Sequence, residues 1–225
     1  MVFDNAGKEL VKADKSLAVF EKARQLAITE SKDIVKECRK SIAISHSANS
    51  ELPGNQESKL KEAQEKADKA AYLLKKLQKR LKDDYGKSWR QDLGKFLINP
   101  EQEIIEAFSL LNILKQRNIP TMEITFRMQI PNSYEMKNDR IKVSRDAYIL
   151  GLLDCVGELK RVAMDSLNRN DSDFANKIYK LMQEMFKKLE SFTQYSNSIK
   201  YLKPKIDSVR YSLTDVKKLL TEKKT

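Results

Sequence analysis

Two pairs of acidic residues stand out because each pair interrupts an apolar helical pattern. Glu103 and Glu106 lie in EQEIIEAFSLLNIL, and Asp154 and Glu158 lie in AYILGLLDCVGELKRVAM. Spacings of three and four residues place the members of a pair on one face of a helix, with Cβ atoms roughly 5 to 6 Å apart. A carboxylate among apolar residues needs an ionic partner, a proton or a metal ion. The four acids are therefore the candidate functional residues of the chain.

Four carboxylates that converge between two packed helices repel one another unless a cation lies among them. Oxygen ligands alone suit a hard divalent cation, magnesium in the first place and manganese as an alternative. A di-iron bundle needs Glu-x-x-His on two helices, and zinc needs histidines or cysteine pairs, whereas this chain has a single histidine, His46. The spacing itself leaves a second interpretation open, in which both pairs are solvated acidic faces.

The other residues with reactive side chains are expected to have structural roles. His46 lies in a loop-like context and is expected at the surface or at a helix end. Arg161 follows Glu158 by three residues, which favours an ion pair between the two. Cys38 and Cys155 occupy apolar helical positions, so we expect buried thiols in a reducing compartment rather than a disulfide.

The composition predicts an all-α protein with one domain over residues 1–225. Of the 225 residues, 40% are hydrophobic and 33% charged, with only 6 glycines and 5 prolines, a balance typical of long amphipathic helices. The net charge of +11 favours polyanionic partners such as nucleic acid or an anionic lipid surface, although lysine-rich helices are also basic for solubility. No apolar run approaches the roughly 20 residues that span a bilayer, and no signal peptide is recognised, so we expect a cytoplasmic protein.

Apolar periodicity predicts two long helices in the first part of the chain. A first helix is expected over residues 6–47, a loop over 45–56 around Pro53 and Gly54, and a second helix over 57–82. The second helix has apolar residues at heptad spacing, which suits antiparallel packing against a neighbouring helix. These residues are Leu60, Ala63, Ala67, Ala70, Leu74, Leu77 and Leu81.

The first acid pair is expected on a third helix over residues 87–118. This helix is weakened at Asn99 and Pro100, and Pro120 marks its end because proline does not continue a helix. The apolar residues between the two acids and beyond them predict that most of its circumference is buried.

The second acid pair follows after two short segments. A short helix is expected over 121–129 with Thr121 as its N-cap, and an exposed loop over 130–143. The helix of the second pair then begins after Ser144, a plausible N-cap, and ends near residue 169. Two further helices are expected, one over 174–192 and one with Pro204 near its first turn.

The segments that contain the acids resemble the translin and translin-associated factor (Trax) family. The most specific part is the pattern YxLGxxDxxGELxR around the second pair, and the likeness extends to ARQLAITESKDIVKECRKSIA, QEIIEAFSLLNILKQRNI and DSVRYSLTDVKKLL. It thus covers nearly the whole chain. The pattern consists of Tyr148, Leu150, Gly151, Asp154, Gly157, Glu158, Leu159 and Arg161.

The resemblance implies a seven-helix antiparallel bundle, an octameric shell and an endoribonuclease activity on single-stranded RNA. In the catalytic Trax subunits, acids at the positions of Glu103, Glu106, Asp154 and Glu158 form a magnesium site that faces an enclosed cavity. Translin subunits lack acids at the first three of these positions, so this chain is similar to the catalytic kind. The implied assembly is a homo-oligomer, as in archaeal Trax-like proteins, or a mixture with a translin-like partner subunit.

Basic residues are expected to bind the nucleic-acid backbone through contacts that do not depend on sequence, so single-stranded DNA is a further expected ligand. The family's histidine-rich segment is replaced here by YGKSWR, where Trp89 and Tyr85 either pack in the core or stack on bases. Two other functions stay open: a non-catalytic oligomer that binds single-stranded DNA or RNA, and a helical scaffold with protein partners. The expected backbone-binding residues are Lys36, Arg39, Lys40, Lys87 and Arg90.

Overall fold

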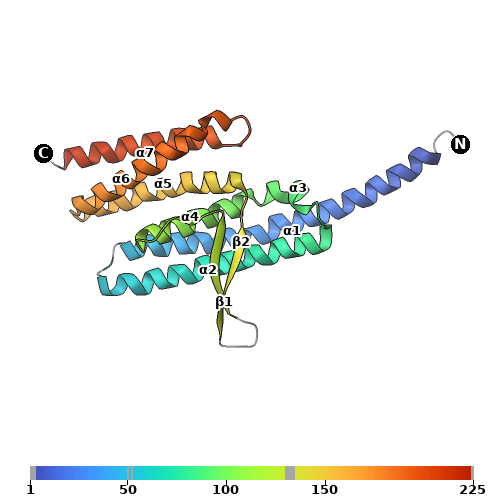
Figure 1. Ribbon diagram of the computed structural model, residues 1–225, viewed down its shortest axis with the longest axis horizontal. Helices are drawn as coiled ribbons and strands as arrows, with labels where there is room; N and C mark the ends of the chain where they lie inside the picture. Colours follow the sequence, from blue (N-terminus) through green and yellow to red (C-terminus); the bar gives the residue numbers. More distant parts are fainter. Residues whose placement is uncertain (1–3, 50, 52, 130–134, 224–225) are drawn as a thin grey trace.

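The computed structural model describes residues 4–49, 51, 53–129 and 135–223 as an elongated bundle of helices with one β-hairpin (Figure 1). Within these residues there are seven α-helices, which confirms the all-α prediction. The helices are α1 (Asp4–Asn49), α2 (Pro53–Tyr85), α3 (Trp89–Leu93), α4 (Ile98–Leu114), α5 (Arg145–Asn168), α6 (Ser172–Glu190) and α7 (Leu202–Glu222). The strands are β1 (Glu123–Gln129) and β2 (Met136–Lys142), and short 3-10 helices cover Gly94–Phe96 and Ser191–Tyr195.

The helices α1 and α2 form a long antiparallel hairpin because each presents small and apolar residues to the other (Figure 1). All seven residues of the predicted α2 seam are buried, which confirms that seam. On α1 the buried residues include Ala27, Ile34 and Cys38. Alanines let the two helices approach closely, and the buried Ser41 hydroxyl donates a hydrogen bond to the Ala63 carbonyl at 2.8 Å.

The predicted loop over residues 45–56 is wrong over most of its length. The helix α1 continues to Asn49 and α2 begins at Pro53, while residues 50 and 52 lie outside the described residues. Ser45 and Ala48 are buried, so tertiary packing holds a last helical turn whose polar sequence indicated a loop. Proline is tolerated at the start of a helix because the N–H that it lacks has no helical partner there.

The hydrophobic core consists of two clusters that meet at α4 and α5. One cluster joins α1, α2, α4 and the β-hairpin, and the other joins α5, α6 and α7 with part of α4. Ile42, Leu114 and Leu152 contact both clusters. The helix α5 packs against α4, α6 and α7, so the second acid pair lies on a helix with neighbours on several sides.

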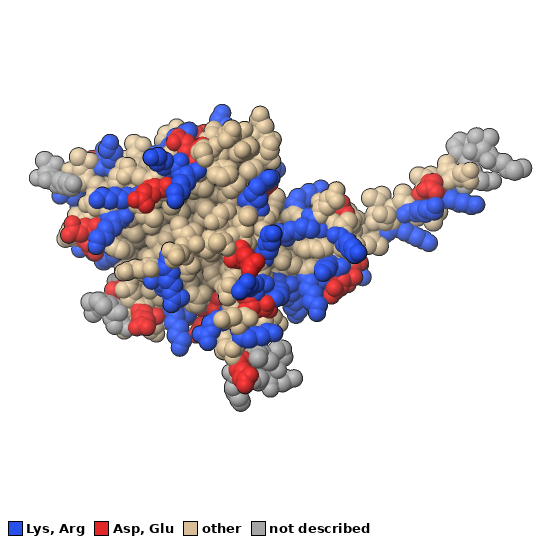
Figure 2. Space-filling view, in the orientation of Figure 1, with Lys and Arg blue, Asp and Glu red and all other residues tan. Residues whose placement is uncertain are grey.

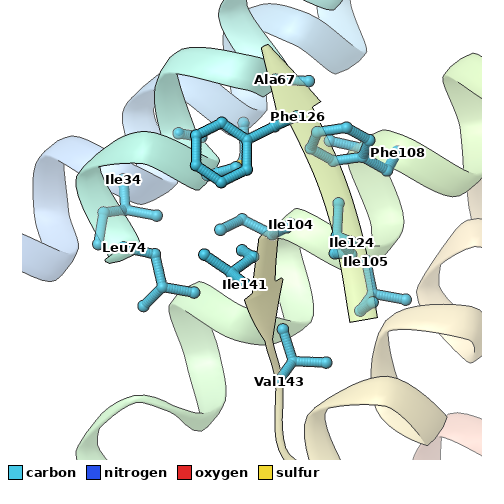
Figure 3. Packing of buried hydrophobic residues seen from close by; sticks show 14 of the residues in the cluster. Ile34, Ala67, Leu74, Ile104, Ile105, Phe108, Ile124, Phe126, Ile141 and Val143 are labelled. Carbon is cyan, nitrogen blue, oxygen red and sulfur yellow. The ribbon is translucent and has the colours of Figure 1, made fainter. Parts of the chain in front are cut away.

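Residues 123–142 contain a β-hairpin, so the predicted short helix and the predicted exposed loop are both wrong there. The strands pair antiparallel, and residues 130–134 between them lie outside the described residues. Thr121 does not cap a helix, since its hydroxyl forms hydrogen bonds within a turn. Alternate residues of β1, Ile124 and Phe126, are buried, which is the two-residue period of a half-buried strand. Figure 3 shows both side chains among apolar residues of α2 and α4.

The predicted third helix is divided into α3, a 3-10 turn and α4. The sequence predicts a helix weakened at Asn99 and Pro100, whereas the break lies before them, because proline is acceptable in the first turn of a helix, where no backbone hydrogen bond is lost. The helix α4 ends at Leu114, four residues earlier than predicted, and Gln116 then adopts a left-handed backbone conformation with φ of 55°.

Glu101 is a fully buried carboxylate in the first turn of α4, and it connects four elements. It accepts hydrogen bonds from Arg90 Nη1 at 2.6 Å, Gln78 Nε2 at 3.2 Å and the Ser144 backbone N–H at 2.8 Å. These donors belong to α3, α2 and the residue before α5. The Ser144 side chain also accepts from the Ala147 N–H at 3.4 Å, which confirms the predicted N-cap.

The two helices predicted for the end of the chain are confirmed. The helix α6 begins at Ser172 and α7 has Pro204 in its first turn. Cys38 and Cys155 are both buried and form no disulfide. Across the described part of the chain, no helix is both long enough and apolar enough to cross a membrane.

Replacing Glu101 is expected to destabilise the bundle, because Arg90, Gln78 and the Ser144 N–H lose their shared acceptor. We expect Glu101→Leu to lower the free energy of unfolding by about 3 kcal/mol, as for other broken buried ion pairs. Urea unfolding at a fixed protein concentration measures this change. The matched control is Glu123→Gln, which breaks an exposed pair with Arg140 and should cost less than about 1 kcal/mol; equal effects would contradict the assigned role.

Asp68 of α2 has a pKa raised to about 6, because burial disfavours its charged form more than the hydrogen bond from Gln64 Nε2 favours it. The unfolded chain ionises near 3.8, so stability is lost as pH rises from there through 6. We expect Asp68→Asn to raise the free energy of unfolding by about 2 to 3 kcal/mol at about pH 7.5 and by little at about pH 4. Urea unfolding at both pH values measures this, and equal gains at the two would contradict it.

Candidate metal centre

The helices α4 and α5 cross in close contact at Gly151, and this crossing brings the two acid pairs together. A Cβ atom at Gly151 would lie 2.5 Å from the Gln102 carbonyl oxygen and 2.7 Å from the Ile105 Cβ. Both separations are shorter than van der Waals contact, so the absence of a side chain allows this approach. Glu103 is the residue after Gln102, and Asp154 lies three residues after Gly151, so one acid of each pair adjoins the crossing.

The four carboxylates are close enough to influence one another. The pKa of Glu106 is raised to about 9, mainly because the side chain is buried. Asp154, Glu103 and Glu158 raise this pKa further, and Lys205 lowers it. Carboxylates repel one another in this way only when they share a site. In the absence of a cation, Glu106 is therefore protonated at neutral pH.

Asp154 and Glu103 also have raised pKa values, in each case mainly because of burial. Asp154 Oδ1 contacts Lys205 Nζ of α7, and Asp154 Oδ2 accepts a hydrogen bond from Gln102 Nε2 at 2.5 Å. Glu103 Oε1 lies 3.7 Å from Arg39 Nη2 of α1. These partners lower the pKa values of Asp154 and Glu103 without cancelling the effect of burial, so the charged forms of both carboxylates stay disfavoured.

Glu158 is paired with His46, and not with Arg161 as the sequence predicts. His46 belongs to the last turn of α1, which confirms the helix-end alternative, but it is only 4% exposed, so the surface alternative is wrong. Its Nε2 atom contacts Glu158 Oε2. Arg161 is exposed and forms no ion pair with Glu158 in the described part of the structure. The sequence does indicate that His46 is buried, because His46 follows Ile42 by four residues and so extends the apolar face of α1.

The donor chemistry of the four acids fits a hard divalent cation, although their arrangement here is not that of a metal site. Among the described residues, no group of three or more His, Cys, Asp or Glu side chains is gathered closely enough to hold a metal ion. Three of the acids are instead directed to basic partners, namely Lys205, Arg39 and His46. Glu103, Glu106 and Asp154, whose charged forms are disfavoured by burial, are nevertheless oxygen donors of the kind that a hard cation binds.

The predicted backbone-binding residues lie at two places. Lys36, Arg39 and Lys40 are exposed on α1, and Arg39 adjoins the acids through Glu103. Lys87 is exposed in the turn between α2 and α3, and these helices carry neither acid pair. Three of the five have partners inside the chain: Arg39 pairs with Glu103, Lys40 with Glu37 at 2.9 Å, and Arg90 with the buried Glu101.

The aromatic residues near α3 pack against the core. Trp89 and Tyr85 are half-buried and adjoin the cluster of α1, α2 and α4. The Arg90 guanidinium lies 5.3 Å from the centre of the Trp89 ring, and the Tyr85 ring lies 6.4 Å from that of Phe20. Of the two interpretations offered by the sequence, packing is therefore the one that these contacts support.

A denser basic surface was missed by reasoning from motifs. Figure 2 shows lysine and arginine side chains crowded where the C-terminal half of α2 lies beside α1 and α3. The sequence signal was the run KKLQKRLK over residues 75–82. Its exposed basic residues are Lys76, Lys79, Arg80 and Lys82.

The fold and the site define an all-helical bundle in which two central helices carry facing acid pairs. The chain belongs to the Translin family, which it matches over residues 22–222. It is also similar to an uncharacterized protein of Methanocaldococcus jannaschii, with 28% identity over 101 residues. That match covers 44% of this chain and 38% of the relative, so the chain spans well under half the length of that protein.

Solved structures share the fold over almost the whole chain. AfC3PO in a complex with duplex RNA has a TM-score of 0.73 and 22% identity, covering 96% of each chain. The crystal structure of AfC3PO itself has the same TM-score at 24% identity, covering 96% of this chain and 97% of that one. Apo-NeC3PO is more distant, with a TM-score of 0.59 and 18% identity over 95% of this chain and 96% of the other.

Substituting Gly151 is expected to separate α4 from α5, because a methyl group there overlaps the Gln102 carbonyl and Ile105. We expect Gly151→Ala to lower the free energy of unfolding by about 1 to 3 kcal/mol, as in other overpacked cores. Gly157→Ala is the matched control on the same helix, since nothing lies within 4 Å of its added Cβ and alanine favours the helix. Urea unfolding of both variants checks this, and a stable Gly151→Ala protein would contradict the close crossing.

Proposed function

We propose that the protein is a divalent-metal-dependent endoribonuclease that cleaves single-stranded RNA, with Glu103, Glu106, Asp154 and Glu158 as metal ligands. Magnesium is the proposed cation, with manganese as a substitute. The observation that carries this proposal is the meeting of two carboxylate pairs at the Gly151 crossing, where Glu106 has a pKa of about 9. A divalent cation bound there would stabilise the charged forms of these carboxylates, which burial disfavours.

Hydrolysis of a phosphodiester needs stabilisation of negative charge and a route for protons. If bound among the four acids, a divalent cation would supply Lewis acidity, which would polarise the phosphate and make a water molecule more acidic. In hydrolysis the oxygen of a water molecule bonds to phosphorus, the bond from phosphorus to the leaving sugar oxygen breaks, and this oxygen takes up a proton from solvent. A carboxylate of the cluster accepts the proton that the water loses and passes it to solvent.

The basic character of the chain supports nucleic acid as the substrate. The net charge is +11, and exposed basic residues occur both beside the acids on α1 and in the dense patch on α2. The fold is also that of AfC3PO, which has been solved in a complex with duplex RNA. We propose that Lys36, Arg39, Lys40, Lys87 and Arg90 contribute phosphate contacts, with single-stranded DNA as a further ligand.

We also propose that the protein assembles into a homo-octamer, with a translin-like partner subunit as the alternative composition. Support comes from the first third of α1, which extends beyond the rest of the bundle in Figure 1. Residues 5–19 are exposed, yet they include Leu10, Val11 and Leu17, which are 70%, 56% and 65% exposed. Large apolar side chains exposed together favour contact with another subunit.

Neutralising the acids should abolish cleavage while leaving RNA binding. We expect Asp154→Asn and Glu106→Gln to lower the rate of magnesium-dependent RNA cleavage by at least about 100-fold, since each removes a metal ligand. Gel assays with single-stranded and duplex RNA, with magnesium or with chelator, measure this. Asp165→Asn, on α5 beyond the cluster, is the matched control and should cleave normally. Undiminished cleavage by both acid variants would overturn the four-acid site.

A non-catalytic, nucleic-acid-binding oligomer is the second candidate function. It is favoured by the fact that Asp154, Glu103 and Glu158 already have basic partners within the chain. In that case RNA binding would weaken steeply with salt and no product would form with any divalent cation. The same assays therefore separate the two functions.

A further inference from the structure

Lys205 is a basic residue that lies beside the acid cluster, and no sequence motif indicated it. It lies in the first turn of α7, and its Nζ atom contacts Asp154 Oδ1 of α5. Its side chain is 25% exposed, while Leu202 and Ile206 on the same turn are fully buried in the core. The backbone that carries Lys205 is therefore fixed, and only the flexible side chain can move.

The charge of Lys205 acts on more than its direct partner. It also lowers the pKa values of Glu103 and Glu106, so a single ammonium group acts on three of the four acids. By contrast, Arg39 contacts Glu103 from a largely exposed position, with 73% of its side chain accessible. Lys205 is thus the basic residue most closely associated with the centre of the cluster.

A divalent cation that binds Asp154 must compete with this ammonium group. The ammonium has three donors and no acceptor, so once displaced it needs another oxygen with negative charge. Because the carbon chain is anchored on α7, the group stays beside the cluster, where the phosphate would bind. A lysine at such a place is a positive point charge suited to a phosphate oxygen.

We propose that Lys205 is a further catalytic residue, whose ammonium group moves from Asp154 to a non-bridging oxygen of the scissile phosphate when metal and RNA bind. This inference rests on the proposed nuclease function. In the ground state without metal, Lys205 balances the charge of Asp154. In the transition state it stabilises the charge that develops on the phosphate oxygens.

The proposal predicts opposite effects of one substitution on metal binding and on cleavage. Lys205→Met removes the competitor for Asp154, so calorimetric titration with manganese alone should show about threefold to tenfold tighter binding than the wild type. The same variant should cleave single-stranded RNA about 100-fold more slowly at saturating metal, because a charged donor to the phosphate is lost. Lys205→Arg should recover much of the cleavage.

Lys203→Met is the matched control, because Lys203 is an exposed lysine two residues away on the same helix. It removes the same charge from α7 and should change neither manganese affinity nor cleavage. Circular dichroism and thermal unfolding establish that each variant is folded, and Lys205→Gln, which keeps a polar side chain, replaces Lys205→Met if that protein unfolds.

Two results would overturn the role of Lys205 and leave the nuclease function intact. In the first, the Lys205→Met protein cleaves like the wild type while Asp154→Asn is inactive. In the second, the Lys205→Met protein binds manganese more tightly and also cleaves faster. The second would make Lys205 only a competitor of the metal. Failure of the nuclease function itself looks different, because the wild-type protein would then release no product in any metal and the proposed catalytic role of Lys205 would fall with it.

Discussion

The close crossing of α4 and α5 is the constraint on which the site depends. At Gly151 the two helices approach until there is no room for a side chain, and the acid pairs lie on either side of this contact. The hydrophobic clusters on the two sides of the bundle also meet at these helices. The apolar packing that stabilises the fold and the electrostatic arrangement of the acids are therefore set by one contact.

Four partly buried acids in one place are costly for a folded protein, and this chain reduces the cost in several ways. Basic side chains from α1 and α7 reach three of the acids, and burial keeps Glu106 protonated without a cation. Since these partners come from helices far apart in the sequence, the charge state of the cluster depends on the correct packing of the whole bundle. A change of charge inside the cluster would correspondingly act on α1 and α7.

Periodicity in the sequence predicted the helices and the α2 seam, because long apolar repeats dominate local structure. It fails where tertiary packing overrides local preference: the polar end of α1 is helical because Ser45 and Ala48 are buried, and β1 is a strand, with Ile124 and Phe126 alternating, where the sequence predicts a helix. The acid pairs were recognisable because they lie at helical spacing. The burial of His46 follows from the apolar face of α1, but its pairing with Glu158 and that of Lys205 with Asp154 do not, since contacts between residues 46 and 158, or 154 and 205, leave no local pattern.

Glu101 has a consequence for the order in which this chain folds. Its three donors come from residues 78, 90 and 144, so its charge is fully satisfied only when α2, α3 and the start of α5 have all docked on α4. A partly folded chain that buries Glu101 earlier leaves a carboxylate without donors in an apolar core, which is costly. The residue thereby penalises incomplete intermediates and couples the two halves of the bundle into one cooperative transition.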